Sequence, residues 1–229
     1  MRDGPLAGRR VALVVAHPDD EVMFFWPTLL KFQSAGMKIS ILCLSTGNAD
    51  GLGDIRKGEM ERSCARIGVL GDALSVLDVA ELRDGFHEWP QHVVSDHVLK
   101  FVRRQEADLV LTFDDYGVSG HPNHISTSLG VRCAYDAAMA STGAAPFQVL
   151  MLRSVGLLMK YIGAMNLLLG GGIASYTCVN PIVCLQALAV HWSQLVWYRV
   201  LFALFSRYAF LNTYVQYGIR SGGADKKNE

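Results

Sequence analysis

The sequence lacks the cysteine patterns typical of a disulfide-bonded protein or of a cysteine zinc site. It has five cysteines, an odd number, and no two of them are spaced C-x-x-C. Reduced thiols facing a cytosolic compartment are the simpler interpretation. An excess of one charge is also missing, because 21 basic residues balance 21 acidic ones and no long basic run occurs. The charge therefore gives no reason to expect nucleic acid as a partner.

Long apolar runs are missing as well, although the chain is apolar as a whole. Residues 1–10 are polar and do not predict a signal peptide, and no clean run of 18 apolar residues predicts a membrane-spanning helix. Hydrophobic residues nevertheless make up 51% of the chain and charged residues only 18%, which is apolar for a soluble protein. Residues 161–198 contain no Asp, Glu, Lys or Arg at all. The apolar excess is therefore concentrated in the last third.

The first two-thirds alternate between short apolar runs and amphipathic stretches, the pattern of a parallel sheet covered by helices. We expect strands at residues 10–15, 38–44, 73–77, 108–113 and from 147, with helices at 21–35, 56–67, 91–104 and 125–139. The first of these helices is expected to be interrupted or kinked near Pro27. The predicted fold class is α/β, a Rossmann-like and mostly parallel sheet with helices on both faces, followed by an apolar helical C-terminal segment.

The length of 229 residues fits one such domain. We assign it to residues 1–217, with the sheet-forming core at about 10–150 and a helical part at about 151–217. The helical part is expected to contain one long aromatic helix over residues 181–217, and residues 218–229 to form a polar, disordered tail. In a parallel sheet of this kind, ligands bind beyond the carboxyl ends of the strands.

Two loops at such strand ends carry residues that can bind a metal. The first strand is followed by the sequence AHPDDE, which contains His17, Asp19 and Asp20. The fourth strand is followed by a loop with His121 and His124, three residues apart. A zinc hydrolysis site needs three protein ligands and one open position. His17 and Asp20 can supply two of the ligands, and one of the two later histidines can complete the set.

The remaining side chains of these loops suit the chemistry of hydrolysis. Asp19 can take a proton from a water at the metal, and the histidine left over can stabilise an oxyanion or protonate a leaving amine. A single His-Pro or Asp-Asp pair is usually an ordinary turn or helix cap. Two such loops, each after a strand and each before a helix, favour a metal site instead.

Three further residues are candidates for binding substrate. Residues 47–54 form a glycine-rich, polar loop that contains Asn48, and Arg56 follows it. The planar guanidinium of Arg56 can bind a phosphate or sugar hydroxyls, while an ion pair with Glu59 or Glu61 on the same helix is the alternative. Asp84, in the sequence LRDG, is a candidate for binding a sugar or inositol hydroxyl.

The sequences AHPDDE and HPNH resemble those of the LmbE-like zinc de-N-acetylases. The resemblance implies that His17, Asp20 and His124 bind Zn²⁺ and that Asp19 is the general base. It also implies that His121 stabilises the tetrahedral intermediate and helps the amine to leave. Iron, cobalt or manganese also fit a site of two histidines and one aspartate.

Longer segments are similar to the glycosylphosphatidylinositol-pathway branch of this superfamily, over residues 11–213. They are AHPDDEVMFFWPTL, STGNADGLGDIRKGE, LRDGFHEW, TFDDYGVSGHPNH and HWSQLVWYRVLFALFSRYAFLNT. The resemblance implies removal of acetate from N-acetylglucosaminyl-phosphatidylinositol, an early step of GPI-anchor biosynthesis, at the cytoplasmic face of the endoplasmic reticulum membrane. The alternatives are a soluble de-N-acetylase of a small N-acetyl sugar conjugate and an inactive metal-binding relative.

The chain departs from the family's pattern in two places. Eukaryotic members of the branch usually carry an N-terminal membrane helix, which this sequence does not show. Many relatives carry Asp where this chain has Asn123, and an Asp there can support His121 electrostatically. We therefore expect Asp114 or Asp115 to support His121 instead.

The predicted C-terminal helix carries aromatic side chains on more than one face, which a small core cannot all bury. Trp and Tyr are favoured at membrane interfaces. We expect the segment to dock on a membrane surface, so that the lipid tail of a glycolipid stays in the bilayer. A helix buried against the sheet is the alternative.

Overall fold

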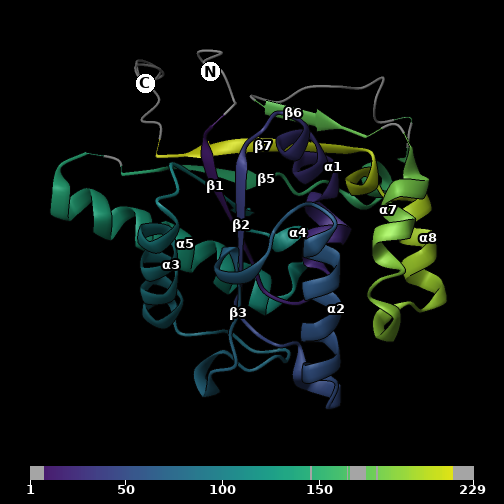
Figure 1. Ribbon diagram of the computed structural model, residues 1–229, viewed down its shortest axis with the longest axis horizontal. Coiled ribbons are helices and arrows are strands. Elements are labelled where there is room, and N and C mark those ends of the chain that lie inside the picture. The colour runs from purple at the N-terminus through teal and green to yellow at the C-terminus, as the bar shows by residue number, and fades with distance from the viewer. Residues whose placement is uncertain (1–7, 145, 164, 166–173, 179, 219–229) are drawn as a thin grey trace, which may run out of the picture.

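The computed structural model describes residues 8–144, 146–163, 165, 174–178 and 180–218 (Figure 1). A seven-stranded sheet crosses the molecule in the order β3-β2-β1-β4-β5-β7-β6. Its strands are β1 (Arg10–Val15), β2 (Lys38–Cys43), β3 (Leu74–Val76), β4 (Leu109–Phe113), β5 (Gln148–Leu152), β6 (Ala174–Thr177) and β7 (Leu211–Tyr217). The first five strands are parallel, and β7 runs antiparallel to both β5 and β6. Apart from residue 218, the predicted tail lies outside the described residues.

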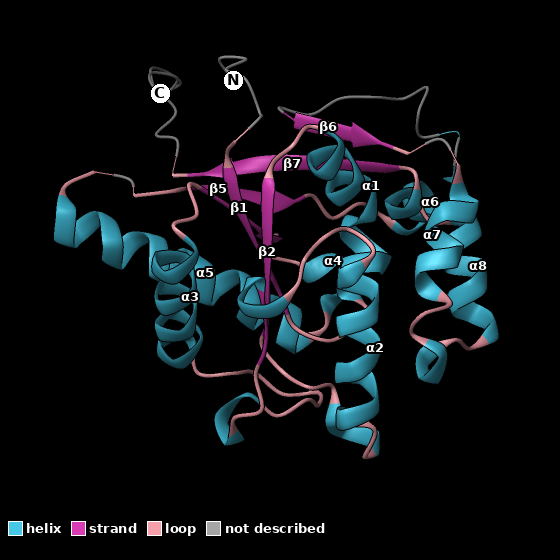
Figure 2. Cartoon of the chain, viewed as in Figure 1, coloured by secondary structure: helices cyan, strands magenta, loops and turns pink. Residues whose placement is uncertain are grey.

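Helices cover both faces of the sheet (Figures 1 and 2). They are α1 (Asp20–Ser34), α2 (Gly53–Ala65), α3 (Gln91–Gln105), α4 (Gly117–Gly120), α5 (Pro122–Thr142), α6 (Leu157–Tyr161), α7 (Pro181–Leu188) and α8 (Trp197–Phe205). The helices α3 and α5 pack together on one face, and α1 and α2 lie on the other. None of the helices in the described ranges is both long and apolar enough to cross a membrane. The predicted α/β fold class is confirmed.

Burial on both faces explains why the central strands could be recognised from the sequence. Val11 and every following residue of β1 is fully buried, so the strand reads as a continuous apolar run rather than an alternating one. The helix α1 runs from Asp20 to Ser34 with Pro27 in its interior. The expected interruption at Pro27 is therefore wrong, whereas a kink there, the other expectation, stays a prediction. Phe25 and Leu29 on either side of Pro27 are fully buried, and their packing offsets the hydrogen bond that proline cannot donate.

The single long C-terminal helix expected from the sequence is also wrong. The segment instead forms α7, α8 and the strand β7. The chain turns between α7 and α8, where Ser193 donates hydrogen bonds from its backbone and hydroxyl to the Glu59 carboxylate. Ser206 ends α8 and its hydroxyl accepts a hydrogen bond from the backbone of Tyr208. The residues that follow, LNTYVQY, are rich in strand formers, and pairing with β5 satisfies backbone groups that an edge strand leaves open.

Candidate metal and active site

The two loops predicted to carry the chemistry meet at the carboxyl ends of β1 and β4, which are neighbours in the sheet. A pocket of about 480 Å³ opens at this edge. Of the eight residues singled out in the sequence, those that line the pocket are His17, Asp19, Asp20, Arg56, Asp84, His121 and His124. The eighth, Asn48, is exposed and its side-chain oxygen accepts a hydrogen bond from the backbone of Gly53 at the start of α2.

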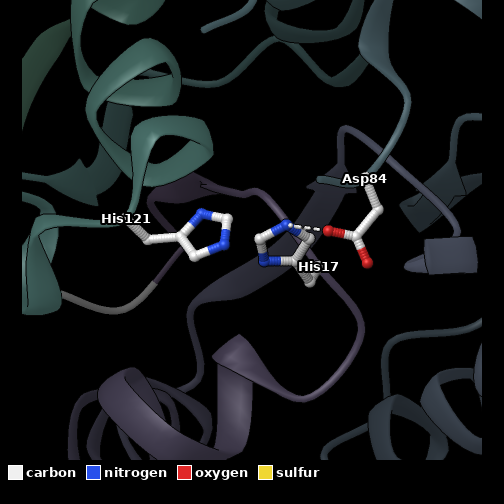
Figure 3. Close-up of side chains that lie close together, drawn as sticks. All are labelled: His17, Asp84 and His121. Atoms are coloured by element: carbon white, nitrogen blue, oxygen red, sulfur yellow. Dashed lines mark ion pairs between the residues drawn. The ribbon is translucent and has the colours of Figure 1, made fainter. Parts of the chain in front are cut away.

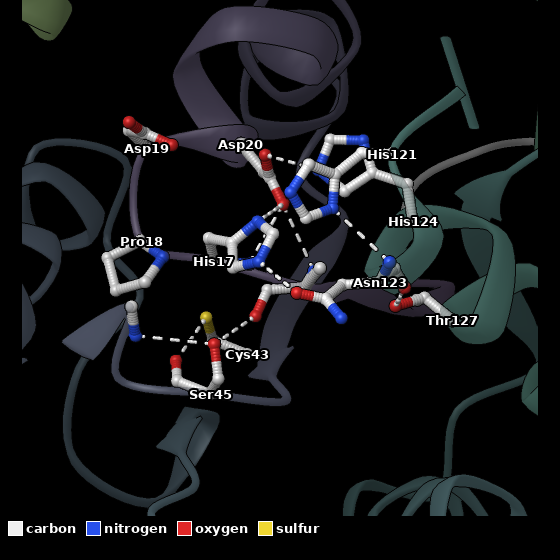
Figure 4. Close-up of polar contacts among 12 residues, drawn as sticks. His17, Pro18, Asp19, Asp20, Cys43, Ser45, His121, Asn123, His124 and Thr127 are labelled. Carbon is white, nitrogen blue, oxygen red and sulfur yellow. Dashed lines mark hydrogen bonds and ion pairs between the residues drawn. The ribbon is translucent and has the colours of Figure 1, made fainter. Parts of the chain in front are cut away.

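Three buried side chains in the pocket form a cluster suited to a metal ion. His17, Asp20 and His124 each offer a ligand atom, and these atoms lie within 4.8 Å of one another. The His124 Nε2 atom is 3.3 Å from Asp20 Oδ1. Two ligands at zinc distances on a tetrahedral centre are also about 3.3 Å apart. Figure 4 shows the three side chains converging, with the Asp19 carboxylate to one side of them.

Hydrogen bonds to the surrounding chain fix the orientation of each of the three side chains. Asp20 Oδ2 accepts hydrogen bonds from the backbone of Ala16 and His17. His124 Nδ1 lies 3.0 Å from the Gly117 carbonyl, so its ring hydrogen is on Nδ1 and its Nε2 is free to bind a metal. The His124 ring also stacks on Phe113 with its centroid 4.3 Å away. Outer contacts of this kind orient metal ligands.

His17 could belong to either of two clusters, because His17, Asp84 and His121 also lie close together (Figure 3). Its Nε2 atom is 3.0 Å from Asp84 Oδ1 and 3.0 Å from Asn123 Oδ1. Both of these are acceptors, so Nε2 carries the hydrogen. The remaining nitrogen, Nδ1, faces Asp20 at 3.8 Å. The geometry therefore favours the cluster of His17, Asp20 and His124.

The electrostatics keep both carboxylates next to His17 ionised. Burial raises the pKa of Asp20, but the charges and hydrogen bonds of His124 and His17 outweigh it and lower the pKa below its usual value. Burial likewise raises the pKa of Asp84, and the hydrogen bond from His17 with the nearby charges lowers it to about 2. An ionised Asp84 fixes the tautomer of His17 in the way that a carboxylate does in many metal sites.

Asp19, the predicted general base, sits in a strained backbone conformation with φ of 109°. Residues other than glycine adopt positive φ at a cost of about 1–3 kcal/mol. The Asp19 N–H donates to Glu21 Oε2 at 3.0 Å, and Glu21 Oε1 lies 2.6 Å from His191 Nε2. Glu21 and His191 are both fully buried. The pair therefore holds the Asp19 backbone in place and leaves its carboxylate directed into the pocket.

Two guanidinium groups flank the Asp19 carboxylate. Arg199 on α8 forms an ion pair with it, and Arg56 lies 3.6 Å from it. Arg56 is buried and donates hydrogen bonds to the carbonyls of Gly47 and Pro18. The alternative predicted for Arg56, an ion pair with Glu59 or Glu61, is therefore wrong, because Arg56 pairs with pocket carboxylates and backbone. Substrate binding by Arg56 stays a prediction. A side chain at Gly47 would place its Cβ 2.5 Å from the Arg56 guanidinium, which explains the glycine there.

His121 is placed to donate a hydrogen bond into the pocket. Its Nδ1 accepts a hydrogen bond from the Asn123 backbone at 3.2 Å, so in the neutral ring the hydrogen is on Nε2. Burial, together with the neighbouring imidazoles of His17 and His124, lowers the pKa of His121 to about 4. The ring is therefore neutral at pH 7.

The expected support of His121 by Asp114 or Asp115 is wrong. Asp114 accepts hydrogen bonds from the backbone and hydroxyl of Ser154, and Asp115 pairs with Arg132. The Asn123 side chain is fully buried and contacts His17 rather than His121. Asn123 is therefore part of the support of a predicted metal ligand.

Sequence reasoning gave no pocket role to five residues from the last third of the chain. Lys160 and Tyr161 come from α6, and Tyr198, Arg199 and Phe202 come from α8. His191 reaches the Glu21 carboxylate from the same part of the chain. The similarity of the segment HWSQLVWYR to one branch of the superfamily was the available signal. It gave no side chain a role, because Arg199 is 180 positions from Asp19 and His191 is 170 positions from Glu21.

Comparisons with known proteins agree with this fold and with the family predicted from the sequence. Residues 12–135 match the family model described as PIG-L, GlcNAc-PI de-N-acetylase. A probable N-acetylglucosaminyl-phosphatidylinositol de-N-acetylase of Dictyostelium discoideum is 32% identical over 92% of this chain and 94% of its own length. The N-acetylglucosaminyl-phosphatidylinositol de-N-acetylase of Bos taurus is 35% identical over 91% of this chain and 84% of its own length.

Solved structures show the same fold. The N,N'-diacetylchitobiose deacetylase of Pyrococcus horikoshii superposes with a TM-score of 0.64 at 19% identity, over 93% of this chain and 86% of that chain. At this identity the likeness concerns the fold alone.

Proposed function

The chain belongs to the PIG-L family of GlcNAc-PI de-N-acetylases, and we propose from this that it removes acetate from N-acetylglucosaminyl-phosphatidylinositol. The products are acetate and glucosaminyl-phosphatidylinositol, an early step of GPI-anchor biosynthesis. The observation that carries the proposal is the buried cluster of His17, Asp20 and His124, with Asp19 beside it in one pocket.

The donor set fits Zn²⁺, since two imidazoles and one carboxylate are the ligands of many zinc hydrolases and leave one position open. His17 Nδ1, one oxygen of Asp20 and His124 Nε2 would hold the ion. When bound, the metal supplies a Lewis acid that polarises the acetamide and makes water more acidic. The same donors also suit other divalent transition metals.

The chain's own residues supply the remaining steps of amide hydrolysis. The Asp19 carboxylate accepts the proton of the attacking water, and this proton then passes to the nitrogen of the leaving amine as the C–N bond breaks. The Nε2–H of neutral His121 donates a hydrogen bond to the oxygen that becomes negatively charged. Arg56 and Asp84, which face the same pocket, are placed to bind sugar hydroxyls.

Acetate release from N-acetylglucosaminyl-phosphatidylinositol in detergent is expected to stop when a chelator removes the metal. It should return when Zn²⁺ is added back, because the three ligands are on rigid strand ends and helix starts. Released acetate and bound metal are measured together. Turnover that occurs only with a water-soluble N-acetyl sugar would instead support the soluble de-N-acetylase, and turnover that resists chelation would contradict metal dependence.

Exposed apolar side chains beside the pocket favour the glycolipid over a soluble sugar. Those of α6 and α8 that are exposed are Leu157, Leu158, Tyr161, Trp197, Tyr198, Leu201 and Phe205. Tyr161 and Tyr198 also line the pocket. We define these seven residues as the apolar rim and propose that it docks on a bilayer, so that the diacyl tail stays in lipid. The GPI pathway of the relatives places the reaction at the endoplasmic reticulum, and we propose its cytoplasmic face.

A variant with Trp197→Ser and Leu201→Ser is expected to bind vesicles more weakly, by about tenfold or more. The reason is that it loses the free energy gained when the Trp and Leu side chains move from water into the bilayer. Trp197 is 74% exposed, so its loss should not affect folding. Co-sedimentation with phosphatidylcholine–phosphatidylinositol vesicles measures the effect. Leu70→Ser is the matched control, since Leu70 is 64% exposed and precedes β3, at the opposite edge of the sheet from β7 and β6. Equal binding by both variants would contradict docking through this surface.

A further inference from the structure

Lys160 on α6 stands between two cavities. It lines the pocket that contains the metal-ligand cluster and a second pocket of about 440 Å³, and Ser119 also lines both. The second pocket is formed by residues of α4, of the segment after β5 and of the start of α6, among them Val118, Ser154 and Leu157. On the same short helix, Leu157 and Leu158 of the apolar rim are 76% and 78% exposed. Lys160 therefore lies between the reaction centre and the surface that we assign to lipid.

The ammonium group of Lys160 has no anionic partner in the described part of the chain. Its Nζ donates to the Val118 carbonyl at 3.1 Å and lies 5.9 Å and 6.0 Å from the ring centroids of Tyr161 and Phe202. Burial lowers its pKa. A half-buried cation held only by a carbonyl and ring faces is poorly compensated, and an anion entering the pocket would be bound strongly.

The sequence around Lys160 lacks the acidic residues that usually form an ion pair with a lysine. Residues 137–224 contain no Asp or Glu, so the part of the chain that forms α6, α7 and α8 is positively charged only. The carboxylates that line the metal-cluster pocket already have close basic partners, since Asp19 pairs with Arg199 and Asp84 lies 3.6 Å from Arg56. Lys160 is left for an anion that comes from outside the protein.

The proposed substrate carries one such anion at the required place. Its phosphodiester lies between the sugar that presents the acetamide and the acyl chains that remain in lipid. We propose, as an inference that rests on the proposed function, that Lys160 Nζ binds the phosphodiester of the glycolipid head group. Lys160 then selects substrates by their phosphate, whereas the metal-ligand cluster and Asp19 act on the acetamide that all N-acetyl sugars share.

The test compares two water-soluble substrates, so that membrane docking does not enter the result. One is the deacylated glycolipid, which keeps the phosphodiester, and the other is N-acetylglucosaminyl-inositol, which lacks it. The wild type is expected to prefer the first by about tenfold or more in kcat/KM, mainly through KM, as a charge-assisted hydrogen bond predicts. In Lys160→Met the ratio of the two kcat/KM values should fall to nearly one, and Lys160→Arg should keep part of the wild-type ratio.

Lys100→Met is the matched control, because it removes the same charge from an exposed position on α3 and should keep the preference. Inhibition of turnover by inorganic phosphate is compared with inhibition by glycerophosphoinositol. Stronger inhibition by glycerophosphoinositol is expected, whereas equal inhibition by both would indicate a general anion site and would overturn selection of this head group. A preference unchanged in Lys160→Met, or lost equally in Lys100→Met, overturns the inference. No acetate release by the wild type from either soluble substrate and from the intact glycolipid in detergent would instead overturn the proposed function.

Discussion

Asp19→Asn is expected to reduce kcat by about 10²- to 10⁴-fold, the range that general base catalysis contributes, while the bound metal stays stoichiometric. The amide has the shape of the carboxylate but cannot accept the proton of the attacking water. Asp19 is not one of the three clustered ligands, so a change there should not release the ion. The effect should appear in kcat more than in KM, because it concerns the transition state.

The matched control for this variant is Asp96→Asn, at an exposed position on α3. It removes one negative charge without touching the pocket and should leave turnover within about twofold of wild type. Acetate release, metal content and thermal unfolding are measured on both variants. Loss of the metal from Asp19→Asn would assign Asp19 to the ligand set instead. Near wild-type turnover would exclude it as the base.

His191→Ala is expected to lower the free energy of unfolding by about 3–5 kcal/mol, because it leaves the Glu21 carboxylate buried without its partner. Both side chains are fully buried and 2.6 Å apart. The loss should also reduce turnover, since Glu21 accepts the hydrogen bond that holds the strained backbone of Asp19. His191→Gln should restore part of both, because its amide can donate to Glu21.

The contribution of this pair should depend on pH in a defined direction. Burial lowers the pKa of His191, but the Glu21 carboxylate outweighs burial and raises the pKa above the ordinary value. A raised pKa in the folded state stabilises the protein fully below the unfolded value of about 6.5. That contribution is lost as the pH rises through the folded value. The difference in unfolding free energy between wild type and His191→Gln should therefore shrink at alkaline pH, whereas a constant difference would indicate a neutral pair.

The sequence by itself determined the five parallel strands and the position of the site. Strands such as β1 could be read directly, because burial on both faces leaves a continuous apolar run. The loops containing His17 and His124 were predicted to meet because parallel strands present their carboxyl ends at one edge of a sheet. The structure does bring them together. The strands and the meeting of the two loops could be predicted because they depend on residues close in sequence and on strand direction.

Only the tertiary structure decided which side chains surround the reactive groups. It brought Arg199 to Asp19, His191 to Glu21 and Asn123 to His17. It also divided the predicted C-terminal helix into α7, α8 and β7. The physical reason is that the partner of a buried polar group is chosen by the packing of segments distant in sequence, since burial without a partner is costly. Local sequence fixes the groups that need partners, and the packed chain supplies them.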